Sequence, residues 1–234
     1  MEIIRADERG YADHGWLKTY HTFSFADYYD PERVHFGTLR VVNDDYILGH
    51  HGFGTHPHEN MEIITIPLEG KLEHKDSTGN SGVIIPGEVQ VMSAGSGIMH
   101  SEKNPGKEPV QLLQIWIFPN KKDVDPRYEQ KQFNDQDCIN KMQLLVSPDG
   151  RDDSLWIYQN AFLSRMFCDE EKVFSYNPYI KENGVFIFNL EGEIEIHGEK
   201  LNKRDTALVQ PGSDIAIQAG NDSKFIIIEI PMQA

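Results

Sequence analysis

Two histidines at strand spacing are the residues of this sequence best suited to do chemistry. His56 and His58 flank Pro57 within the stretch 52–62, and the fixed φ and missing N–H of proline exclude the interior of a helix there. The stretch is therefore expected to be extended, and residues two apart in a strand point to the same side. Two imidazoles would then face one volume, as neighbouring ligands of a metal ion do.

A second pair of ligand-type residues has the same spacing. His100 and Glu102 lie in the stretch 98–102, and in a strand they too would share one face. Three imidazoles and one carboxylate can hold one divalent transition metal ion, and Fe(II), Mn(II), Ni(II), Co(II), Cu(II) and Zn(II) all accept such ligands. We therefore predict a metal site built from His56, His58, His100 and Glu102. The alternative is a hydrogen-bonded polar network of the same four residues.

Other polar residues carry weaker signals. Glu62 follows His58 by four residues on the same expected face, so it is an alternative ligand or a supporting neighbour of the site. His21 has no partner two residues on and is expected to be a hydrogen-bonded structural residue. Of the adjacent pair His50 and His51, at most one can face inward. Surface or turn positions are expected for His35, His74 and His197, and a turn with solvated carboxylates is expected at 43–45.

Short strands must position these groups. Apolar runs recur along the chain with Gly or Pro in nearly every gap, and no convincing amphipathic helix interrupts them in the first half. This rhythm favours an all-β antiparallel barrel or double-sheet sandwich. The expected strands are 37–43, 46–50, 61–68, 71–74, 82–85, 89–93 and 110–118, then 142–146, 155–159, 161–168, 185–190, 193–197, 206–210, 214–218 and 224–230.

The chain divides into two similar halves. Residues 119–137 are polar and contain two prolines, which is typical of a connection between domains. We expect an N-terminal metal-binding domain over 1–137, including this linker, and a C-terminal domain over 138–234. The turn sequences Leu-Glu-Gly, Pro-Gly and Ala-Gly recur in both halves at nearly constant offsets, which predicts a duplicated fold. On that alignment the second-half counterparts of the four ligands lie near Pro178, Ile180, Phe225 and Ile227, so the second copy would lack a metal site.

Composition limits the possible functions. The 234 residues include 22 basic and 37 acidic side chains, and the formal net charge of −15 opposes contact with nucleic acid or anionic lipid. No apolar run approaches the length of a membrane span, and the N-terminus lacks the pattern of a signal peptide. The only cysteines, Cys138 and Cys168, are far apart in sequence and fit no metal-binding motif, which fits a reduced compartment. We therefore expect a cytoplasmic protein without a disulfide framework.

The motifs along the chain resemble those of the pirins, two-domain members of the cupin superfamily, and in particular the bacterial pirins described as quercetinases. The likeness covers nearly the whole length and is carried by several segments together. His100 followed four residues later by Asn104 also fits the second cupin motif, whereas Gly95 stands where the general pattern has proline. The segments are 14–17, 21–26, 29–31, 54–58, 68–70, 92–95 and 97–102.

The resemblance implies a bicupin, with two β-barrel or double-stranded β-helix domains in tandem. It carries the family's ligands onto the same four residues, His56, His58, His100 and Glu102, with Fe(II) as the first expectation for the metal. The implied activity is that of a quercetin 2,3-dioxygenase, which opens a flavonol with dioxygen and releases carbon monoxide. Glu102 or an unligated carboxylate would take the proton of the 3-hydroxyl group.

Two further expectations depend on this implied activity. Phe53, Met61, Ile98 and Met99 lie near the ligands in sequence and would form an apolar wall for flat rings, or else ordinary barrel core. A non-enzymatic regulator that senses metal or redox state and binds a protein partner is the alternative function, as in the nuclear pirins. An internally duplicated chain already pairs two domains, so a monomer is expected.

Overall fold

The computed structural model describes residues 1–233, and nearly all regular elements in this range are β-strands. The chain forms two compact units. This confirms the all-β expectation. The short 3-10 helices are η1 (Ala6–Glu8), η2 (Asp135–Cys138) and η3 (Arg151–Asp153).

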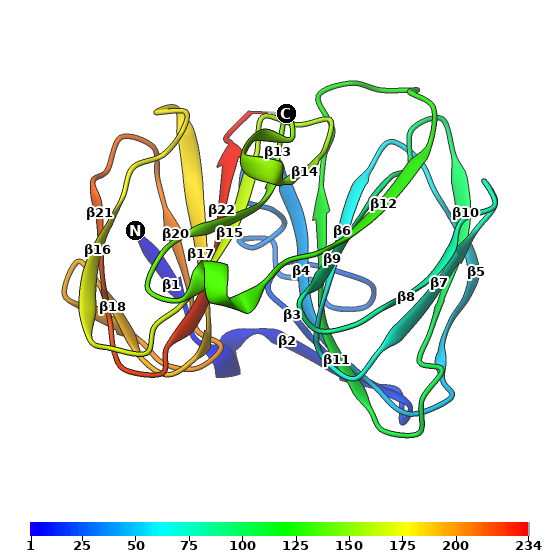
Figure 1. The fold of residues 1–234 in the computed structure, drawn as a ribbon, viewed down its shortest axis with the longest axis horizontal. Helices are drawn as coiled ribbons and strands as arrows, with labels where there is room; N and C mark the ends of the chain where they lie inside the picture. Colours follow the sequence, from blue (N-terminus) through cyan, green and yellow to red (C-terminus); the bar gives the residue numbers. More distant parts are fainter. Residues whose placement is uncertain (234) are drawn as a thin grey trace. The chain divides into compact units, whose positions relative to one another are not determined.

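The first unit contains residues 10–133 and 155–159, and its two antiparallel sheets face each other in Figure 1. One sheet has the strand order β12-β9-β6-β11-β4-β3-β2, and the other has the order β5-β10-β7-β8. The strands are β2 (Gly10–Asp13), β3 (Leu17–His21), β4 (Leu39–Ile47), β5 (Gly52–His58), β6 (Glu62–Glu69), β7 (Leu72–Asp76), β8 (Ser81–Ile84), β9 (Glu88–Ser93), β10 (Ile98–Lys103), β11 (Val110–Ile117) and β12 (Arg127–Gln132).

The second unit contains residues 1–9, 134–154 and those from 160 onward. Its sheets have the orders β1-β20-β17-β22-β15-β13-β14 and β16-β21-β18-β19. The strands are β1 (Glu2–Ile4), β13 (Gln143–Ser147), β15 (Phe162–Phe167), β16 (Lys172–Tyr176), β17 (Asn183–Glu191), β18 (Ile194–Ile196), β19 (Glu199–Leu201), β20 (Thr206–Val209), β21 (Ile215–Ala219) and β22 (Lys224–Pro231). The last strand of the first order, β14 (Leu155–Trp156), falls within residues 155–159 of the first unit.

The two halves share the strand order of the small sheets and of the centre of the large ones, where β9-β6-β11-β4 matches β20-β17-β22-β15, which supports the predicted duplication. The detailed alignment on turns was wrong, however, because β10 corresponds to β21 and not to β22. In the ladders, His100 lies opposite His56 and Ile98 opposite His58, as Ile217 lies opposite Phe174 and Ile215 opposite Tyr176. Phe174, Tyr176 and Ile217, rather than Pro178, Ile180 and Phe225, therefore stand where the first half has its three histidines.

Relative to the expected split at residue 137, residues 1–9 belong to the second unit and residues 155–159 to the first. Strand β12 lies inside the expected linker 119–137 and pairs with β9 of the first unit. Strand β1, from the start of the chain, pairs with β20 of the second unit. The two segments occupy the same edge position in the two large sheets. The second unit thus takes its edge strand from the start of the chain, whereas β12 is continuous with the rest of the first unit.

The interior of each unit is apolar. In the second unit the cluster includes Tyr176, Ile217 and Ala219 of the small sheet packed against Phe225 and Ile227 of the large one. In the first unit, smaller apolar clusters form around Leu72 and around Ile63. No helix among residues 1–233 is long and apolar enough to cross a membrane. Both cysteines are free and buried, as expected.

One expected turn is part of a strand. Residues 43–45 lie within β4, and Asn43, Asp44 and Asp45 are only 3–5% exposed. The two strands expected at 37–43 and 46–50 are therefore one. Polar residues in the middle of an apolar pattern resemble a turn in sequence, but here Asn43 and Asp45 share a face of β4 that points into the unit.

Candidate metal centre

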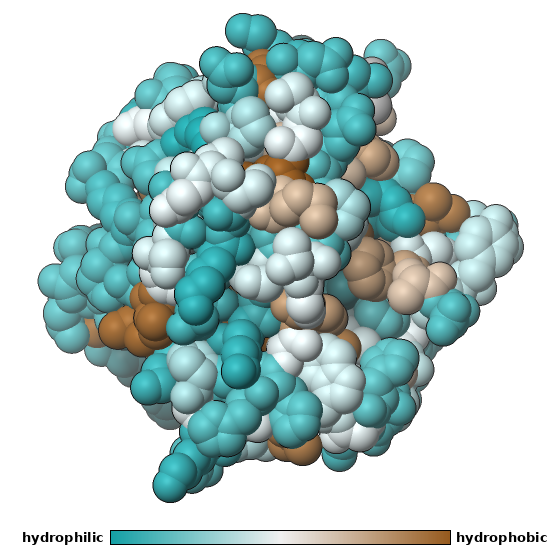
Figure 2. Space-filling model, turned by 90° about the vertical axis from the view of Figure 1, so that its right-hand side faces the viewer, coloured by the Kyte–Doolittle hydropathy of each residue, from teal (hydrophilic) through white to brown (hydrophobic). Residues whose placement is uncertain are grey.

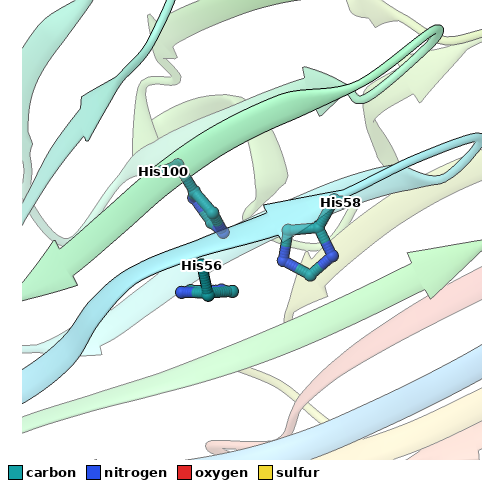
Figure 3. A group of neighbouring side chains, drawn as sticks. All are labelled: His56, His58 and His100. Atoms are coloured by element: carbon teal, nitrogen blue, oxygen red, sulfur yellow. The ribbon is translucent and has the colours of Figure 1, made fainter.

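Three of the four predicted ligands converge on one point. His56 and His58 extend from the same face of β5, and His100 extends from the neighbouring strand β10 (Figure 3). The ring centroids are 4.9 Å apart for His56 and His58, 4.4 Å for His56 and His100, and 4.8 Å for His58 and His100. One candidate ligand nitrogen of each residue lies within 4.8 Å of the other two.

The backbone of β5 fixes the tautomer of His56. Its Nδ1 lies 2.8 Å from the carbonyl oxygen of Gly54, which can only accept, so Nδ1 carries the proton and Nε2 offers its lone pair. Strand β5 can approach β10 closely because residue 52 is glycine: a Cβ there would lie 2.2 Å from the carbonyl oxygen of Glu102. A β-bulge between His100 and Glu102 interrupts the ladder at this point.

A chain of hydrogen bonds fixes the tautomer of His100. His74 Nε2 lies 3.1 Å from Asp76 Oδ2; although burial raises the pKa of Asp76, hydrogen bonds from Thr78, His74 and Asn80 lower it to about 2. The carboxylate is therefore ionised and accepts the Nε2 proton, and in the matching neutral tautomer of His74 the Nδ1 atom is an acceptor. His100 Nδ1, 3.5 Å away, must donate to it. The lone pair of His100 is then on Nε2, which is buried without a partner in residues 1–233.

Burial keeps two of the imidazoles neutral. Desolvation and then the nearby His56 lower the pKa of His58 to about 4. Desolvation, followed by the neighbouring histidines His56, His58 and His74, lowers the pKa of His100 to about 3. A metal ion needs the unprotonated ring, so little proton competition is expected at neutral pH. Neutral rings and an unpartnered Nε2 therefore suit one divalent metal ion.

Replacing His74 tests the hydrogen-bond chain. His74→Phe keeps a ring against Tyr128, on which His74 stacks at 4.5 Å between centroids, but removes the acceptor for His100 Nδ1–H. We expect the affinity for Ni(II) or Mn(II) to fall about 10- to 100-fold, as is usual when the partner of a ligating histidine is lost. Metal titration followed by calorimetry measures this. Asp76→Asn should cause a smaller loss, and unchanged affinity in both variants would contradict the chain.

Glu102 lies beside the three histidines rather than among them. Its carboxylate forms a second close group with His74 and His100, accepts a hydrogen bond of 2.9 Å from Gln114 Nε2, and also accepts one from Thr65. The side chain is 3% exposed, and burial raises its pKa. In the second group, both ring nitrogens of His74 are engaged in hydrogen bonds, to Asp76 and to His100. The three-histidine group is therefore the better candidate for the metal centre. Whether Glu102 completes it stays a prediction.

Glu62 is turned away from the histidines. It is 1% exposed and accepts a 2.7 Å hydrogen bond from Ser93 Oγ, whereas its strand neighbour Ile63 faces the cavity beside the histidines. Successive residues of a strand point to opposite faces, so Glu62 is not placed as an alternative ligand. The spacing of four residues suggested that Glu62 shares a face with His58. Residues 59–61 lie outside β5 and β6, so the alternation of a strand does not continue from His58 to Glu62.

Glu62 should nevertheless make the stability of the protein depend on pH. Burial raises its pKa from 4.5 to about 7, against the lowering effects of Ser93, Tyr158 and Arg127. The folded state therefore binds more protons than the unfolded state between these values, and stability should fall as pH rises through about 7. Glu62→Gln should raise the unfolding free energy at pH 8 by about 1–3 kcal/mol and reduce the slope. Urea unfolding at pH 5 and pH 8 in EDTA measures it, and equal slopes would refute it.

A cavity of about 270 Å³ adjoins the histidines. Of the four apolar residues expected to line it, only Phe53 does so; Met61 and Ile98 pack in a core cluster, and Met99 is 41% exposed. The wall is instead built by residues far away in sequence, which strand spacing could not identify. The lining comprises Phe25, Asn43, Asp45, Phe53, His56, His58, Ile63, His100, Glu102, Gln114 and Trp116.

The other histidines divide into buried and exposed ones. His74, expected at the surface or in a turn, is fully buried in β7, because alternation puts it on the inner face. His21 is buried and its Nδ1 lies 2.9 Å from Asn43 Oδ1, which confirms its hydrogen-bonded role. His50 and His51 are both exposed. His35 and His197 are exposed as expected.

Comparison with known families assigns the two halves. The family model described as Pirin matches residues 4–117, and the one described as the quercetinase C-terminal cupin domain matches residues 144–230. Two consecutive cupin domains define the chain as a bicupin. It belongs to the pirin family.

Relatives agree over nearly the whole length. A protein of Escherichia coli strain K12 named quercetin 2,3-dioxygenase is 45% identical over 232 residues, covering 98% of each chain. A pirin-like protein of Caulobacter vibrioides is 40% identical over 226 residues, covering 95% of this chain and 96% of its own. The crystal structure of a bacterial pirin from E. coli in complex with nickel(II) superposes with a TM-score of 0.93 at 43% identity, over 98% of both chains.

Proposed function

We propose that this protein is a metal-dependent dioxygenase of the quercetinase type, acting on flavonols. The observation that carries the proposal is the convergence of three imidazoles, one with an unpartnered Nε2, on a cavity that also contains two buried carboxylates. The name of the E. coli relative supports the substrate class. The nickel(II) bound by the similar E. coli pirin supports a divalent metal.

His56, His58 and His100 would hold the ion, with Glu102 as the fourth ligand and Fe(II) as the first expectation. A bound divalent ion would polarise the oxygens of the flavonol and lower the cost of ionising its 3-hydroxyl group. Three or four protein ligands leave positions open on an ion that prefers six. Mn, Ni, Co, Cu and Zn suit the same ligands.

The protein's own groups would orient and deprotonate the substrate. Glu102 lines the cavity, and burial raises the pKa of its carboxyl. A base with a pKa near the working pH is well suited to take the proton of the 3-hydroxyl group. Phe25, Phe53 and Trp116 would exclude water around the flat rings.

The overall reaction balances without another reactant. One flavonol and one dioxygen give the ring-opened ester and one carbon monoxide, in which C3 leaves with its own oxygen. Both atoms of dioxygen remain in the ester. Dioxygen is the oxidant and the flavonol supplies the electrons, so no external reductant is required.

Anaerobic reconstitution followed by exposure to oxygen tests the activity. The metal-free protein is loaded separately with Fe(II), Mn(II), Ni(II), Co(II) or Cu(II) and mixed with quercetin, and oxygen uptake and carbon monoxide release are measured. Equal amounts of both gases are expected with at least one metal. A matched variant, His58→Ala, should lose the activity while His51→Ala, an exposed histidine just before β5, keeps it. No turnover with any metal would remove the dioxygenase proposal.

A metal- or redox-sensing regulator is the other candidate, and the cavity is the observation that weighs against it. A sensor needs no enclosed space with aromatic walls beside its metal. On the face shown in Figure 2, apolar residues lie in separate patches among hydrophilic ones, rather than in one broad contact surface. The monomeric state, cytoplasmic location and absence of nucleic-acid partners stay predictions.

A further inference from the structure

A second cavity adjoins the metal cavity in the first unit. Its volume is about 350 Å³, and it lies over β2 and β3, next to β4 in the large sheet. Phe25, Asn43, Asp45 and Phe53 line both cavities. The sheet order explains the arrangement, because the metal cavity lies over β6, β11 and β4, and β4 continues into β3 and β2.

Size alone shows why the metal cavity needs an extension. Pockets that enclose drug-sized ligands have volumes of roughly 300–1,000 Å³, and the metal cavity has about 270 Å³. A flavonol has a fused pair of rings and a third ring attached to them. The metal cavity can accept the reacting end, and the adjoining cavity has room for the remaining ring.

Asp45 marks the boundary between the two cavities. It is 4% exposed, and its Oδ1 has no hydrogen-bond partner in the described part of the chain. The Thr19 hydroxyl hydrogen-bonds to the same carboxyl group, and Thr19 also lines the second cavity. A buried acceptor without a partner is costly unless a ligand or water supplies a donor.

The lining selects the chemistry of the ligand. Phe25, Tyr28 and Phe53 provide aromatic walls, and the charged side chains among the lining residues are the acidic Asp27 and Asp45, with no Lys or Arg. An anionic group is therefore disfavoured, whereas a phenolic O–H can donate to Asp45. At the outer end the cavity reaches the exposed residues Tyr11 and His14.

We propose that the second cavity is the binding compartment for a hydroxylated aromatic ring of the substrate, with Asp45 accepting a hydrogen bond from a phenolic hydroxyl. The proposal rests on the proposed function, because that function places the reacting end at the metal. The proposal adds that the second cavity, over β2 and β3, distinguishes polyphenols of different size. Asp45 is in this respect a residue that determines specificity.

Blocking the second cavity alone tests the compartment. Ala12 lines the second cavity but not the first, so Ala12→Phe should fill it without touching the metal ligands, and Ala12→Ser is the control of nearly unchanged size. Metal-loaded protein is titrated anaerobically with quercetin and with the one-ring probe catechol, so that no turnover is needed. We expect Ala12→Phe to weaken quercetin binding at least about 10-fold and catechol binding less than about 2-fold, a gap within reach of steric exclusion.

Asp45→Leu tests the hydrogen bond, with Asp45→Asn as the variant of equal shape. Asp45→Leu should weaken quercetin binding at least about 10-fold, because the phenolic donor loses its buried acceptor. The affinity of Asp45→Asn should lie between those of Asp45→Leu and wild type. Folding and metal content are checked first by circular dichroism and metal analysis. The compartment proposal is wrong if Ala12→Phe changes the affinities for quercetin and catechol equally, or changes neither. It is also wrong if the wild-type protein binds no quercetin. If the size dependence holds but no oxygen is consumed, the compartment stands and the dioxygenase proposal fails.

Discussion

His100→Ala should abolish metal binding and leave the metal-free protein folded. The variant removes the ring that lies nearest to both other imidazoles, with centroid distances of 4.4 and 4.8 Å against 4.9 Å between His56 and His58. We expect the affinity for Ni(II) or Mn(II) to fall more than about 100-fold, beyond the loss caused by removing a mere hydrogen-bond partner of a ligand. The metal-free protein should stay folded, because Nε2 of His100 forms no hydrogen bond within residues 1–233 and the variant removes only the long Nδ1 contact of 3.5 Å to His74 together with the packing of one ring.

Thermal unfolding with and without metal separates these effects. A ligand present at 100 times its dissociation constant stabilises the folded state by about 2.7 kcal/mol, so wild type should show a metal-dependent rise in melting temperature that His100→Ala lacks. His35→Ala, at an exposed site, is the control and should keep that rise. If metal-free His100→Ala is unfolded, the residue serves the fold rather than a metal, and both proposed functions lose their basis.

The fold was largely predictable because local pattern and global fold agree. Strand spacing placed His56 with His58 and His100 with Glu102, and the ladder between β5 and β10 brings the three histidines together. Edge strands β1 and β12 were not predictable, because the three residues of β1 are too few to show a strand pattern and the sequence of β12 is polar throughout most of its length; they pair with β20 and β9. Tertiary pairing overrides local preference in such segments.

The surroundings of the site were harder to predict than its histidines. Asp45 and His74 have the sequence context of a turn and a surface strand, yet both are buried beside the site. Their burial depends on partners distant in sequence, such as Thr19 for Asp45 and His100 for His74. Spacing along one strand carries no information about such cross-strand partners.

The second half uses the place of the metal site for a different purpose. By their ladder partners, Tyr176 is the counterpart of His58. In the large sheets, Ile63 lies opposite Trp116 and its counterpart Val185 lies opposite Glu229. Glu229 is therefore the counterpart of Trp116. Glu229 is fully buried and accepts hydrogen bonds from Tyr176 OH, the backbone N–H groups of Tyr179 and Ile180, and Asn183 Nδ2, at 2.8–3.0 Å. One carboxylate thus ties the segment between β16 and β17 to β22.

Glu229→Ala should therefore destabilise the protein by about 3–5 kcal/mol, because it leaves two buried and two partly buried donors without their acceptor. Glu229→Gln keeps one oxygen but turns an amide NH₂ toward the other donors, so its loss should be intermediate. Tyr176→Phe removes a single hydrogen bond and should cost about 1–3 kcal/mol, because its partner is a charged group. Denaturant unfolding gives these values, and amide exchange should show the loss of protection centred on residues 177–183. If Glu229→Gln were as stable as wild type, the shape of the side chain, and not its carboxylate, would be what this half has in place of the metal site.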